Sequence, residues 1–465
     1  MATSRVTVAG AGMAGLCSTL LLARRGYAVT LLERDPWFAG ELAPTDRRGI
    51  PHYRQPHALI PRARAELARS MPDVFEGLLA MGSDDVDLRP KLPGRSGPAD
   101  EDLRYLAVRR PVLEGALRRA VDEEPTVTVR AGVRLRGLRV AAGRAVGVDL
   151  DEGEIETDLV VDGLGRRSCL RPLPSEQTSD CGVVYYSRYY RLRPGATLPD
   201  GPWLLSPRGD LGYMAYASFP GDNGTFAAVL AVPPGDPDWK AFRHEDVFEA
   251  AVAEIPTLAS WADPALVEPI TGLMAMSGLR NLAPPVAFPL EGYVAVGDSF
   301  SHTDPVLAHG IAFCLVHAAT LVALLDEHGV DGVGEAYLSR MRPEAQERFE
   351  LATALDAQRL RMWCGDSVDV SPAGDYALFT MAAGGAVAAV DPEVFRVFVR
   401  RIGLLDSTRV LDDDVALQRR IAERFAELMA SPRPAQGPSR DEMLELVREP
   451  RPAVRDPTPT PQSVP

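Results

Sequence analysis

A glycine-rich turn near the start of the chain constrains the fold more than any other feature. The sequence Gly10-Ala11-Gly12-Met13-Ala14-Gly15 follows the apolar segment Arg5–Ala9, which predicts a short buried strand. Residues 13–25 then predict a helix, and Tyr27–Leu32 predicts a second strand that ends at Glu33. A strand, a glycine turn, a helix, a strand and an acid in this order form the βαβ unit that binds dinucleotides.

Each glycine of this turn has a physical role in binding a nucleotide. Gly10 permits the tight turn, Gly12 lets backbone N–H groups approach a pyrophosphate, and Gly15 lets the helix pack closely against the strands. The helix N-terminus offers unpaired N–H donors to the phosphates. Glu33 can accept hydrogen bonds from both ribose hydroxyls. The residues expected to contact the nucleotide here are Gly10, Gly12, Met13, Ala14, Gly15, Glu33 and Arg34.

A second glycine motif lies far along the chain. Residues 293–296 are apolar and predict a strand, which leads into Gly297-Asp298. A loop through Pro305 follows, and a helix is expected to begin near Gly310. Together with the N-terminal turn, this arrangement resembles the flavoprotein monooxygenases related to p-hydroxybenzoate hydroxylase, in which the two motifs hold one FAD molecule.

The resemblance implies how the second motif would hold the cofactor. Asp298, directly after Gly297, would accept a hydrogen bond from a ribityl hydroxyl, and the loop through Pro305 would pass the flavin ring. The helix after Gly310 and Ile311 would aim its N-terminus at the pyrimidine end of the ring, where negative charge collects when the flavin is reduced.

A third segment agrees with the same family. Residues 108–117 are similar to its Arg-x-x-Leu-x-x-x-Leu helix start, so that Arg110 would point at the FAD phosphates or the ribityl chain. A guanidinium suits that role because its fork binds phosphate through two hydrogen bonds. Residues 127–129 and 132–135 alternate as strands, and the backbone at Val133 would touch the adenine. The resemblance spans roughly residues 4–345.

The chain also departs from the family pattern. Relatives usually carry a glycine where Ala308 stands and often a histidine where Ser301 stands. Relatives that bind NADPH directly carry an Asp where an alignment on residues 168–171 places Leu164, whereas Asp162 comes two residues early. In this respect the chain is more similar to styrene monooxygenases, squalene epoxidases, geranylgeranyl reductases and flavin halogenases, several of which receive electrons from a separate partner.

Composition limits the class of protein. At 465 residues and 46% hydrophobic, the chain can bury a large core and is expected to build more than one domain. Its net charge of −14 and pI near 5.1 argue against a nucleic-acid partner. Five scattered cysteines favour reduced thiols in a cytoplasmic protein over disulfides or a metal site. We find no secretory signal and no transmembrane segment, and we interpret Tyr376–Val390 as a buried helix.

The expected fold class is α/β, with a Rossmann-type FAD-binding domain interleaved with an antiparallel-sheet substrate domain. The FAD-binding domain is expected at residues 1–60, 103–170 and 285–345, the substrate domain at 61–102 and 171–284, a helical region at 346–430 and a mostly disordered tail at 431–465. Strands are expected at Cys181–Leu192, Tyr213–Phe219 and Thr225–Val232, and helices at Pro61–Ser83, Asp246–Ile255, Glu344–Arg361, Pro392–Ile402, Val415–Met429 and Arg440–Val447.

Few side chains stand out as candidates for chemistry. In the first expected strand, Tyr185 and Tyr189 share one face, and Tyr186 and Tyr190 share the other. One face is expected to look toward the flavin, where it would suit an aromatic substrate, although aromatic residues also favour half-buried strands for packing alone. Three histidines could approach the flavin ring: His57, which is a catalytic candidate, His302 and His309. A lone histidine is, however, more often structural.

The resemblance implies an FAD-dependent monooxygenase that hydroxylates or epoxidises a hydrophobic or aromatic small molecule with O₂, through a flavin C4a-hydroperoxide, in specialised metabolism. Electrons would come from NAD(P)H directly or through a separate flavin reductase. The alternatives are an FAD-dependent reductase of the geranylgeranyl reductase type and a non-catalytic flavin-binding protein. A halogenase is disfavoured because that family needs a catalytic lysine near the middle of its substrate tunnel. The only lysines are Lys240 and Lys91, and Lys91 lies in a proline-flanked loop.

Overall fold

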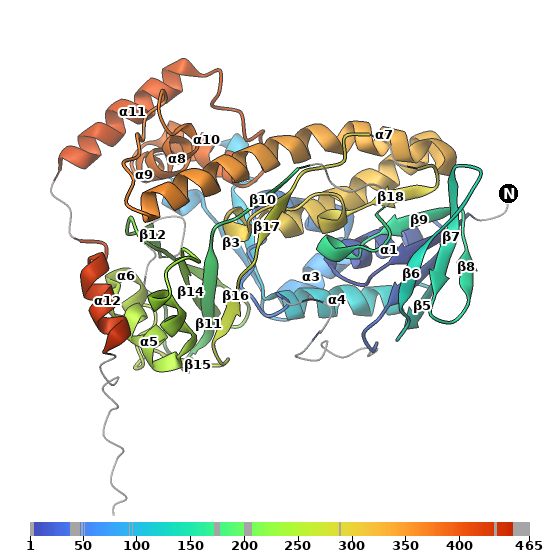
Figure 1. Ribbon diagram of the computed structural model, residues 1–465, viewed down its shortest axis with the longest axis horizontal. Coiled ribbons are helices and arrows are strands. Elements are labelled where there is room, and N and C mark those ends of the chain that lie inside the picture. The colour runs from blue at the N-terminus through green and yellow to red at the C-terminus, as the bar shows by residue number, and fades with distance from the viewer. Residues whose placement is uncertain are drawn as a thin grey trace, which may run out of the picture.

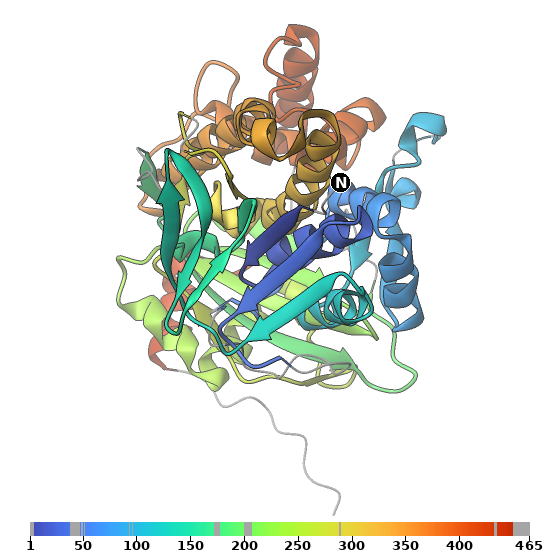
Figure 2. The ribbon, with the colours of Figure 1, turned by 90° about the vertical axis from the view of Figure 1, so that its right-hand side faces the viewer.

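A five-stranded parallel sheet organises the first half of the fold (Figures 1 and 2). The computed structural model describes residues 4–37, 47, 50, 52–92, 94, 96–171, 177–199, 207–287, 290–431 and 435–449. In spatial order the strands are β18 (Tyr293–Ala295), β9 (Leu159–Asp162), β1 (Arg5–Ala9), β2 (Ala28–Glu33) and β5 (Val127–Ala131). Because all five are parallel, the turns after β1 and β18 emerge at the same edge of the sheet, although about 290 residues of chain separate them.

Both faces of this sheet are covered, as is usual for a parallel sheet. Val6, Val8 and Val161 face the helices α1 (Met13–Arg24), α4 (Arg110–Asp122) and α7 (His309–Trp363). Ala9, Val160 and other side chains of the opposite face pack against a small antiparallel sheet of β6 (Leu135–Ala141), β7 (Arg144–Leu150) and β8 (Glu154–Glu156). The predicted strand at residues 132–135 is therefore mostly a turn, since β6 begins only at Leu135 and Gly132 has a φ of +73°.

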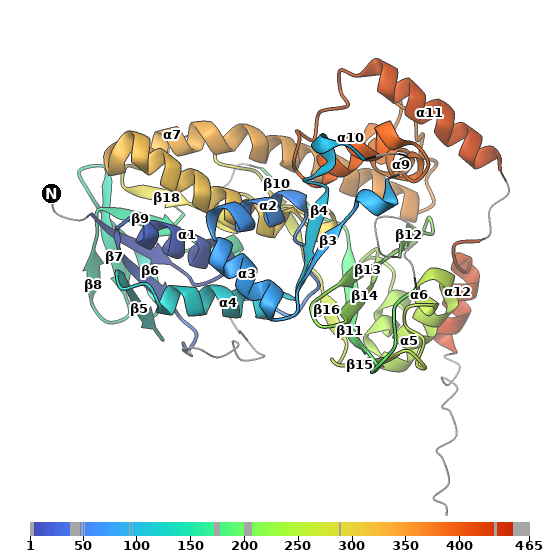
Figure 3. The ribbon, with the colours of Figure 1, turned by 180° about the vertical axis from the view of Figure 1, so that it is seen from behind.

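Helices α2 (Pro61–Ser70) and α3 (Pro72–Ala80) replace the single predicted helical excursion (Figure 3). The break falls at Pro72, which cannot continue a hydrogen-bonded helix. Leu67 and Val74 belong to the same hydrophobic core as α1 and α7. This packing groups α2 and α3 with the Rossmann unit, whereas we expected residues 61–102 to belong to the substrate domain. A hairpin of β3 (Asp84–Asp87) and β4 (Arg104–Ala107) follows.

The second large sheet is antiparallel, as expected. Its strands are β12 (Arg208–Asp210), β13 (Ala215–Pro220), β14 (Thr225–Val232), β11 (Val184–Leu192) and β15 (Val267–Pro269), with β16 (Met274–Met276) paired to β11. The bounds of β14 are those predicted, and β11 starts three residues later than predicted because β10 (Thr178–Asp180) pairs separately with β17 (Arg280–Leu282). In Figure 1 this sheet lies beside the Rossmann unit, below α7.

The tyrosines of β11 divide between the two faces of this sheet as predicted. Tyr186 and Tyr190 lie in an aromatic core with Trp239, beneath α5 (Glu245–Glu254), α6 (Pro256–Ala259) and α12 (Arg440–Arg448). Tyr185 and Tyr189 are buried on the opposite face, where the Tyr185 hydroxyl donates to Asp304 in the loop after β18. Tyr186 and Tyr190 therefore serve the packing of the aromatic core, whereas Tyr185 and Tyr189 lie on the side of the sheet that looks toward the Rossmann half.

Helix α7 runs along both halves of the molecule (Figure 1). Its backbone breaks at Gly329, whose φ is +67°, and the chain turns back there, so that Tyr337 and Arg348 of the second segment pack against His317 and His309 of the first. The boundary that we expected at residue 345 therefore falls inside a helix. By length and composition α7 could cross a membrane, but 67% of its most apolar stretch is buried inside the protein, as in the core helix of a globular domain.

The remaining helices form a separate layer over the hairpin of β3 and β4. They are α8 (Tyr376–Leu378), a π-helical turn at Phe379–Ala383, α9 (Gly384–Ala388), α10 (Pro392–Ile402) and α11 (Val415–Ala430). Helix α10 has the bounds predicted, and Tyr376–Val390 is largely buried helix. Within the expected tail, α12 forms as predicted and packs on the antiparallel sheet, while residues 450–465 lie outside the described residues.

Candidate cofactor site

Close packing requires glycine at two positions of the N-terminal turn. Gly10 has a φ of +90°, and its N–H donates to the Leu32 carbonyl at 2.8 Å. A Cβ at Gly15 would lie 1.7 Å from the Gly10 carbonyl oxygen. A Cβ at Gly12 would instead meet only the tip of Ile50, at 3.8 Å. Gly12 is thus not required by packing, which leaves the approach of a ligand as the reason for its small size.

The turn presents backbone donors that the described chain leaves without acceptors. Gly12 begins α1 with no side-chain cap, and its carbonyl accepts from Leu16. Among the described residues, no acceptor faces the N–H groups of residues 12–15. An uncapped helix start with a small cradle in front of it fits the pyrophosphate of a dinucleotide.

Glu33 lies where the expected ribose acid should be, but it already has protein partners. One carboxylate oxygen accepts from the Ala11 N–H at 2.9 Å and from Arg47 at 2.5 Å, and the other accepts from the Asp35 N–H. Arg47 also donates to the Ala11 carbonyl and to Glu114, and only 5% of its surface is exposed. Sequence reasoning missed Arg47, because no local pattern marks this arginine as the partner of two distant acids.

Arg110 is buried at the start of α4, close to this cluster. Its Nε donates to Glu114 at 2.7 Å, one helical turn later, and Glu114 also binds Arg47. The Nη1 of Arg110 lies 3.5 Å from Nε2 of His57, whose Nδ1 donates to the Gln55 carbonyl at 2.7 Å. Burial, and then the Arg110 charge, lower the pKa of His57 to about 3. A histidine that stays neutral can orient a ligand but is a poor proton acceptor.

The Gly297-Asp298 turn packs directly on the N-terminal turn. A Cβ at Gly297 would lie 2.7 Å from the Ala14 side chain, and the φ of Gly297 is +58°. Asp298 is half-buried, and within the described part of the chain its carboxylate has no hydrogen-bond partner. The two motifs therefore meet at one place, with the Asp298 carboxylate available to a ligand.

The loop after Asp298 ends in a strained residue. Ala308, the residue before α7, has φ and ψ of +56° and +24°, the left-handed conformation that glycine adopts without strain. This geometry explains why the family usually has glycine at this position. Pro305, Val306 and Gly310 are exposed around this turn, and a Cβ at Gly310 would meet nothing within 4 Å. Room is thus left in front of the α7 N-terminus.

Asp162 has a structural part in the sheet. Its buried carboxylate accepts from Ser168 at 2.5 Å, from Tyr293 at 2.8 Å and from Ser299 at 3.0 Å. It also accepts from the Leu164 N–H at 3.0 Å. These bonds join β9, β18 and the Gly297 turn, so the side chain has no capacity left to bind NADPH.

The remaining predicted residues lie around the same edge. Val133 donates its N–H to the Glu33 carbonyl at 3.1 Å, and Arg34 is exposed next to Glu33. His302 donates from Nδ1 to the Asp298 carbonyl at 3.2 Å, and burial lowers its pKa. His309 is buried, and its Nδ1 accepts from Arg348 at 3.4 Å.

The comparisons with known proteins agree with this geometry. A family model described as an NAD(P)-binding Rossmann-like domain matches residues 8–71. No curated protein matches the chain by sequence. Among solved structures, PqsL from Pseudomonas aeruginosa, described as a probable FAD-dependent monooxygenase, is 14% identical with a TM-score of 0.56, over 78% of this chain and 99% of that one. The flavin-dependent brominase Bmp2 is 15% identical with a TM-score of 0.60, over 92% and 100%.

The chain has the fold of the FAD-dependent monooxygenases and halogenases. A third solved structure, 2-methyl-3-hydroxypyridine-5-carboxylic acid oxygenase, is 17% identical with a TM-score of 0.54, over 78% of this chain and 94% of that one. The resemblance to the superfamily of p-hydroxybenzoate hydroxylase is thus confirmed in fold, and so are the Rossmann-type core, the antiparallel sheet and the C-terminal helices.

Proposed function

We propose that the chain is an FAD-dependent monooxygenase that hydroxylates or epoxidises a hydrophobic or aromatic small molecule. The observation that carries the proposal is the direct packing of Gly297 on Ala14. This contact joins two turns, each followed by an uncapped helix start, so one extended cofactor can reach from the first to the second. A lone Rossmann unit would need only the first turn.

The residues present fit FAD along its length. The N–H groups of residues 12–15 would bind the pyrophosphate, with Arg110 nearby as a cation. The Glu33 carboxylate would bind the ribose while it also accepts from Arg47. Asp298 would accept from the ribityl chain, and the α7 N-terminus at Gly310 and Ile311 would stabilise negative charge on the pyrimidine end.

The antiparallel sheet supplies a surface suited to an apolar substrate. On the face of β11 that looks toward the Rossmann half, Tyr185 packs with Val229, Met276 and Trp363. Reduced FAD activates O₂ for insertion into an electron-rich substrate. The protein needs to hold the substrate near the ring and to exclude water, which explains why no nucleophile with an activating base stands out among the residues of the site.

The positions of the two lysines support an oxygenase over a halogenase, although solved structures of both classes share this fold. PqsL has been solved with 2-aminobenzoylacetate, and the pyridine carboxylate oxygenase is named for an aromatic substrate. The brominase and the chondrochloren halogenase share the fold as well. However, Lys240 is exposed in the 3₁₀-helical segment Asp238–Arg243, at the outside of the aromatic core. Lys91 lies in the short 3₁₀ turn Arg89–Lys91, near the C-terminal helices. Neither lysine belongs to the face of Tyr185.

We further propose that electrons arrive through a separate flavin reductase, in a cytoplasmic enzyme. The full use of Asp162 inside the sheet supports the first point, because direct use of NADPH in this family involves an aspartate in that segment. The five free cysteines, three of them buried, support the second.

Oxygen uptake tests the proposal. The purified chain is supplied with FAD and a panel of hydroxylated and amino-substituted aromatic compounds, with NADPH or NADH, with and without an added flavin reductase. We expect substrate-dependent O₂ consumption and a product one oxygen atom heavier, only with the reductase. Reduction of a double bond without O₂ uptake would contradict the monooxygenase and favour the reductase. Turnover with NADPH alone would contradict only the separate electron supply.

A further inference from the structure

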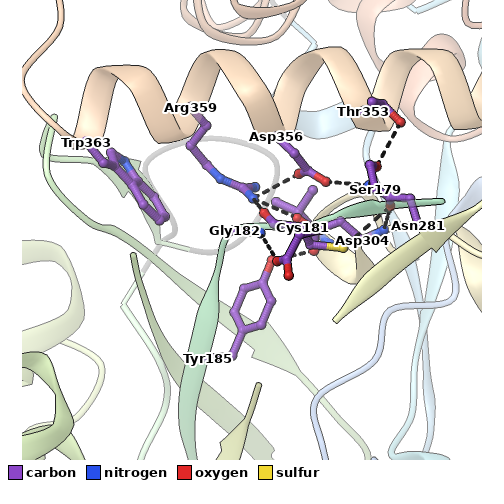
Figure 4. Close-up of polar contacts among 12 residues, drawn as sticks. Ser179, Cys181, Gly182, Tyr185, Asn281, Asp304, Thr353, Asp356, Arg359 and Trp363 are labelled. Carbon is purple, nitrogen blue, oxygen red and sulfur yellow. Dashed lines mark hydrogen bonds and ion pairs between the residues drawn. The ribbon is translucent and has the colours of Figure 1, made fainter. Parts of the chain in front are cut away.

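A buried polar cluster joins α7, the antiparallel sheet and the loop before Pro305 (Figure 4). It lies beyond the groups assigned to the cofactor, and no residue of it was marked by the sequence patterns except Tyr185. Its acidic and basic members are buried, with 5% or less of each residue exposed. The members are Cys181, Tyr185, Asn281, Asp304, Asp356 and Arg359.

Asp304 is held by three separate elements. Its N–H donates to the Asn281 side chain of β17 at 2.6 Å. Its carboxylate accepts from the Tyr185 hydroxyl of β11 at 2.7 Å and from Arg359 of α7 at 2.9 Å. The same carboxylate caps the Val306 N–H. The backbone immediately before Pro305, which is expected to pass the flavin ring, is therefore fixed by side chains from both halves of the molecule.

One nitrogen of Arg359 lies within hydrogen-bond distance of three acceptors, which is more than its hydrogens can serve. Its Nη2 lies 2.9 Å from Asp304, 2.9 Å from Asp356 and 3.0 Å from the Cys181 carbonyl. A guanidinium Nη carries only two hydrogens. Two buried carboxylates thus share one nitrogen of a single arginine, and with both ionised a net negative charge would be left in a buried place.

The contacts indicate which carboxyl would hold a proton that neutralises this charge. Asp304 accepts three hydrogen bonds, from a phenol, a guanidinium and a backbone N–H, whereas Asp356 accepts two, from Arg359 and from the Asn281 amide at 2.8 Å. Burial, and then the Asp304 charge, raise the pKa of Asp356 well above its usual range. The titratable groups that face this pair or its arginine are Tyr185, Cys181, Asp180, Asp210 and Arg359. Burial raises the pKa of Tyr185 and of Cys181, so both stay neutral.

We propose that Asp304 and Asp356 share one proton, held on Asp356, and that this pair with Arg359 positions the Pro305 loop for the flavin. With the proton, the two carboxyls and the arginine are neutral overall in a buried place. Without it, one negative charge is left uncompensated, and the two carboxylates repel each other across a contact that fixes the loop. Asp304, Asp356 and Arg359 are thus positioning residues, and loss of the proton at alkaline pH loosens the loop.

This inference rests on the proposed function, since it needs a flavin in the site, and FAD affinity as a function of pH tests it. The dissociation constant of FAD is measured by flavin fluorescence across neutral to alkaline pH. For the wild type we expect a rise of up to about tenfold per pH unit, the limit for one linked proton, above the pKa of Asp356. Asp356→Asn imitates the protonated carboxyl and should bind FAD equally well at neutral pH, without the alkaline rise. Asp304→Asn should weaken binding at every pH.

Asp366→Asn is the matched control, because Asp366 follows α7 and pairs with Arg361 at the surface, with 61% of its side chain exposed. It should keep the wild-type profile. Identical profiles for the wild type and Asp356→Asn overturn the inference, while absence of FAD binding at any pH overturns the proposed function instead. Should Asp356→Asn not fold, infrared spectroscopy of the wild type decides: a protonated buried carboxyl band must disappear on alkaline titration, and its absence at neutral pH overturns the inference.

Discussion

The two turns that meet at the edge of the parallel sheet are built in different ways. In the N-terminal turn, Gly10 and Gly15 are required by backbone geometry within a few residues of each other. In the second turn only Gly297 has that role, and the position before α7 carries Ala308 in a left-handed conformation. The second loop is held instead by distant side chains, chiefly those around Asp304.

This difference teaches that a local motif and a long-range network can serve the same cofactor. The shape of the N-terminal turn comes from its own glycines and the first strand pair, and the buried cluster of Glu33, Arg47 and Glu114 supports it through Ala11. The second loop depends on residues from β11, β17 and α7, so its geometry can respond to the charge state of a buried pair. Four sets of variants test the comparison, from the largest expected effect to the smallest.

Substitutions at two glycines of the first turn should separate folding from binding. Gly15→Ala places a Cβ 1.7 Å from a backbone oxygen and should cost about 3 kcal/mol or more of unfolding free energy. Gly12→Ala meets no close atom and should leave the melting temperature unchanged while FAD affinity falls about tenfold or more. Thermal unfolding and FAD titration of both variants measure this. Equal FAD affinity for Gly12→Ala and the wild type would contradict the assigned pyrophosphate site.

Removing the charge of Glu114 should destabilise the first turn through Arg47, which binds both Glu114 and the Ala11 carbonyl. Glu114 is fully buried between Arg47 and Arg110, so Glu114→Gln removes the acid partner of Arg110 and one of the acid partners of Arg47, and it should cost about 3 kcal/mol. Denaturant unfolding measures the loss. The control is Glu124→Gln, whose partner Arg24 lies at the surface and whose loss should cost less than about 1 kcal/mol. Similar costs for both variants would show that the buried cluster does not support the turn.

The partly buried His57 should make the fold sensitive to acid. Its pKa in the folded protein, about 3, is below that of an unfolded histidine near 6.5. The unfolded chain therefore takes up a proton first, so stability is full above about pH 6.5 and falls as the pH drops from there toward 3. His57→Asn should flatten part of this slope in melting temperature. The exposed His328 provides the control, and a slope that His57→Asn leaves unchanged would show that His57 is not buried as neutral imidazole.

Relieving the strain at Ala308 should have the smallest effect. Ala308→Gly removes the cost of a left-handed alanine but adds freedom to the unfolded chain, so a net gain of up to about 1 kcal/mol is expected. Ala336→Gly, inside α7, should lose about 1 kcal/mol. Thermal unfolding measures whether each variant gains or loses stability. Destabilisation by Ala308→Gly would mean that the loop is not strained at this point.

Local patterns were enough to predict the elements of the Rossmann unit and most of the antiparallel sheet. The glycine turn, β14 and α10 depend on neighbouring residues, and each was found close to its predicted bounds. We expected α2 and α3 in the substrate domain, whereas they pack in the core of the Rossmann unit, because an amphipathic helix shows only that it has a partner, not which one. Helix α7 was not predicted as one element, because the chain turns back at Gly329 and the two helical segments on either side of it pack against each other, His309 against Arg348 and His317 against Tyr337.

The candidate site could be predicted in its backbone parts only. The turns at Gly12 and Gly297 have sequence signatures, whereas Arg47, Glu114 and Arg359 act through contacts between residues far apart in the chain. Asp162 illustrates the same limit: the sequence shows only that it comes two residues before the aspartate of NADPH-binding relatives, and the structure shows that its carboxylate is used inside the sheet. A single sequence carries no signal for such pairings.

The central claim is that two distant turns form one site for FAD, and equilibrium titration of the purified chain with FAD tests it most directly. The account predicts saturable binding of one FAD per chain, with affinity lowered both by Gly12→Ala in the first turn and by Asp298→Asn in the second. Failure to bind FAD, or binding that depends on one turn and is indifferent to the other, would contradict it.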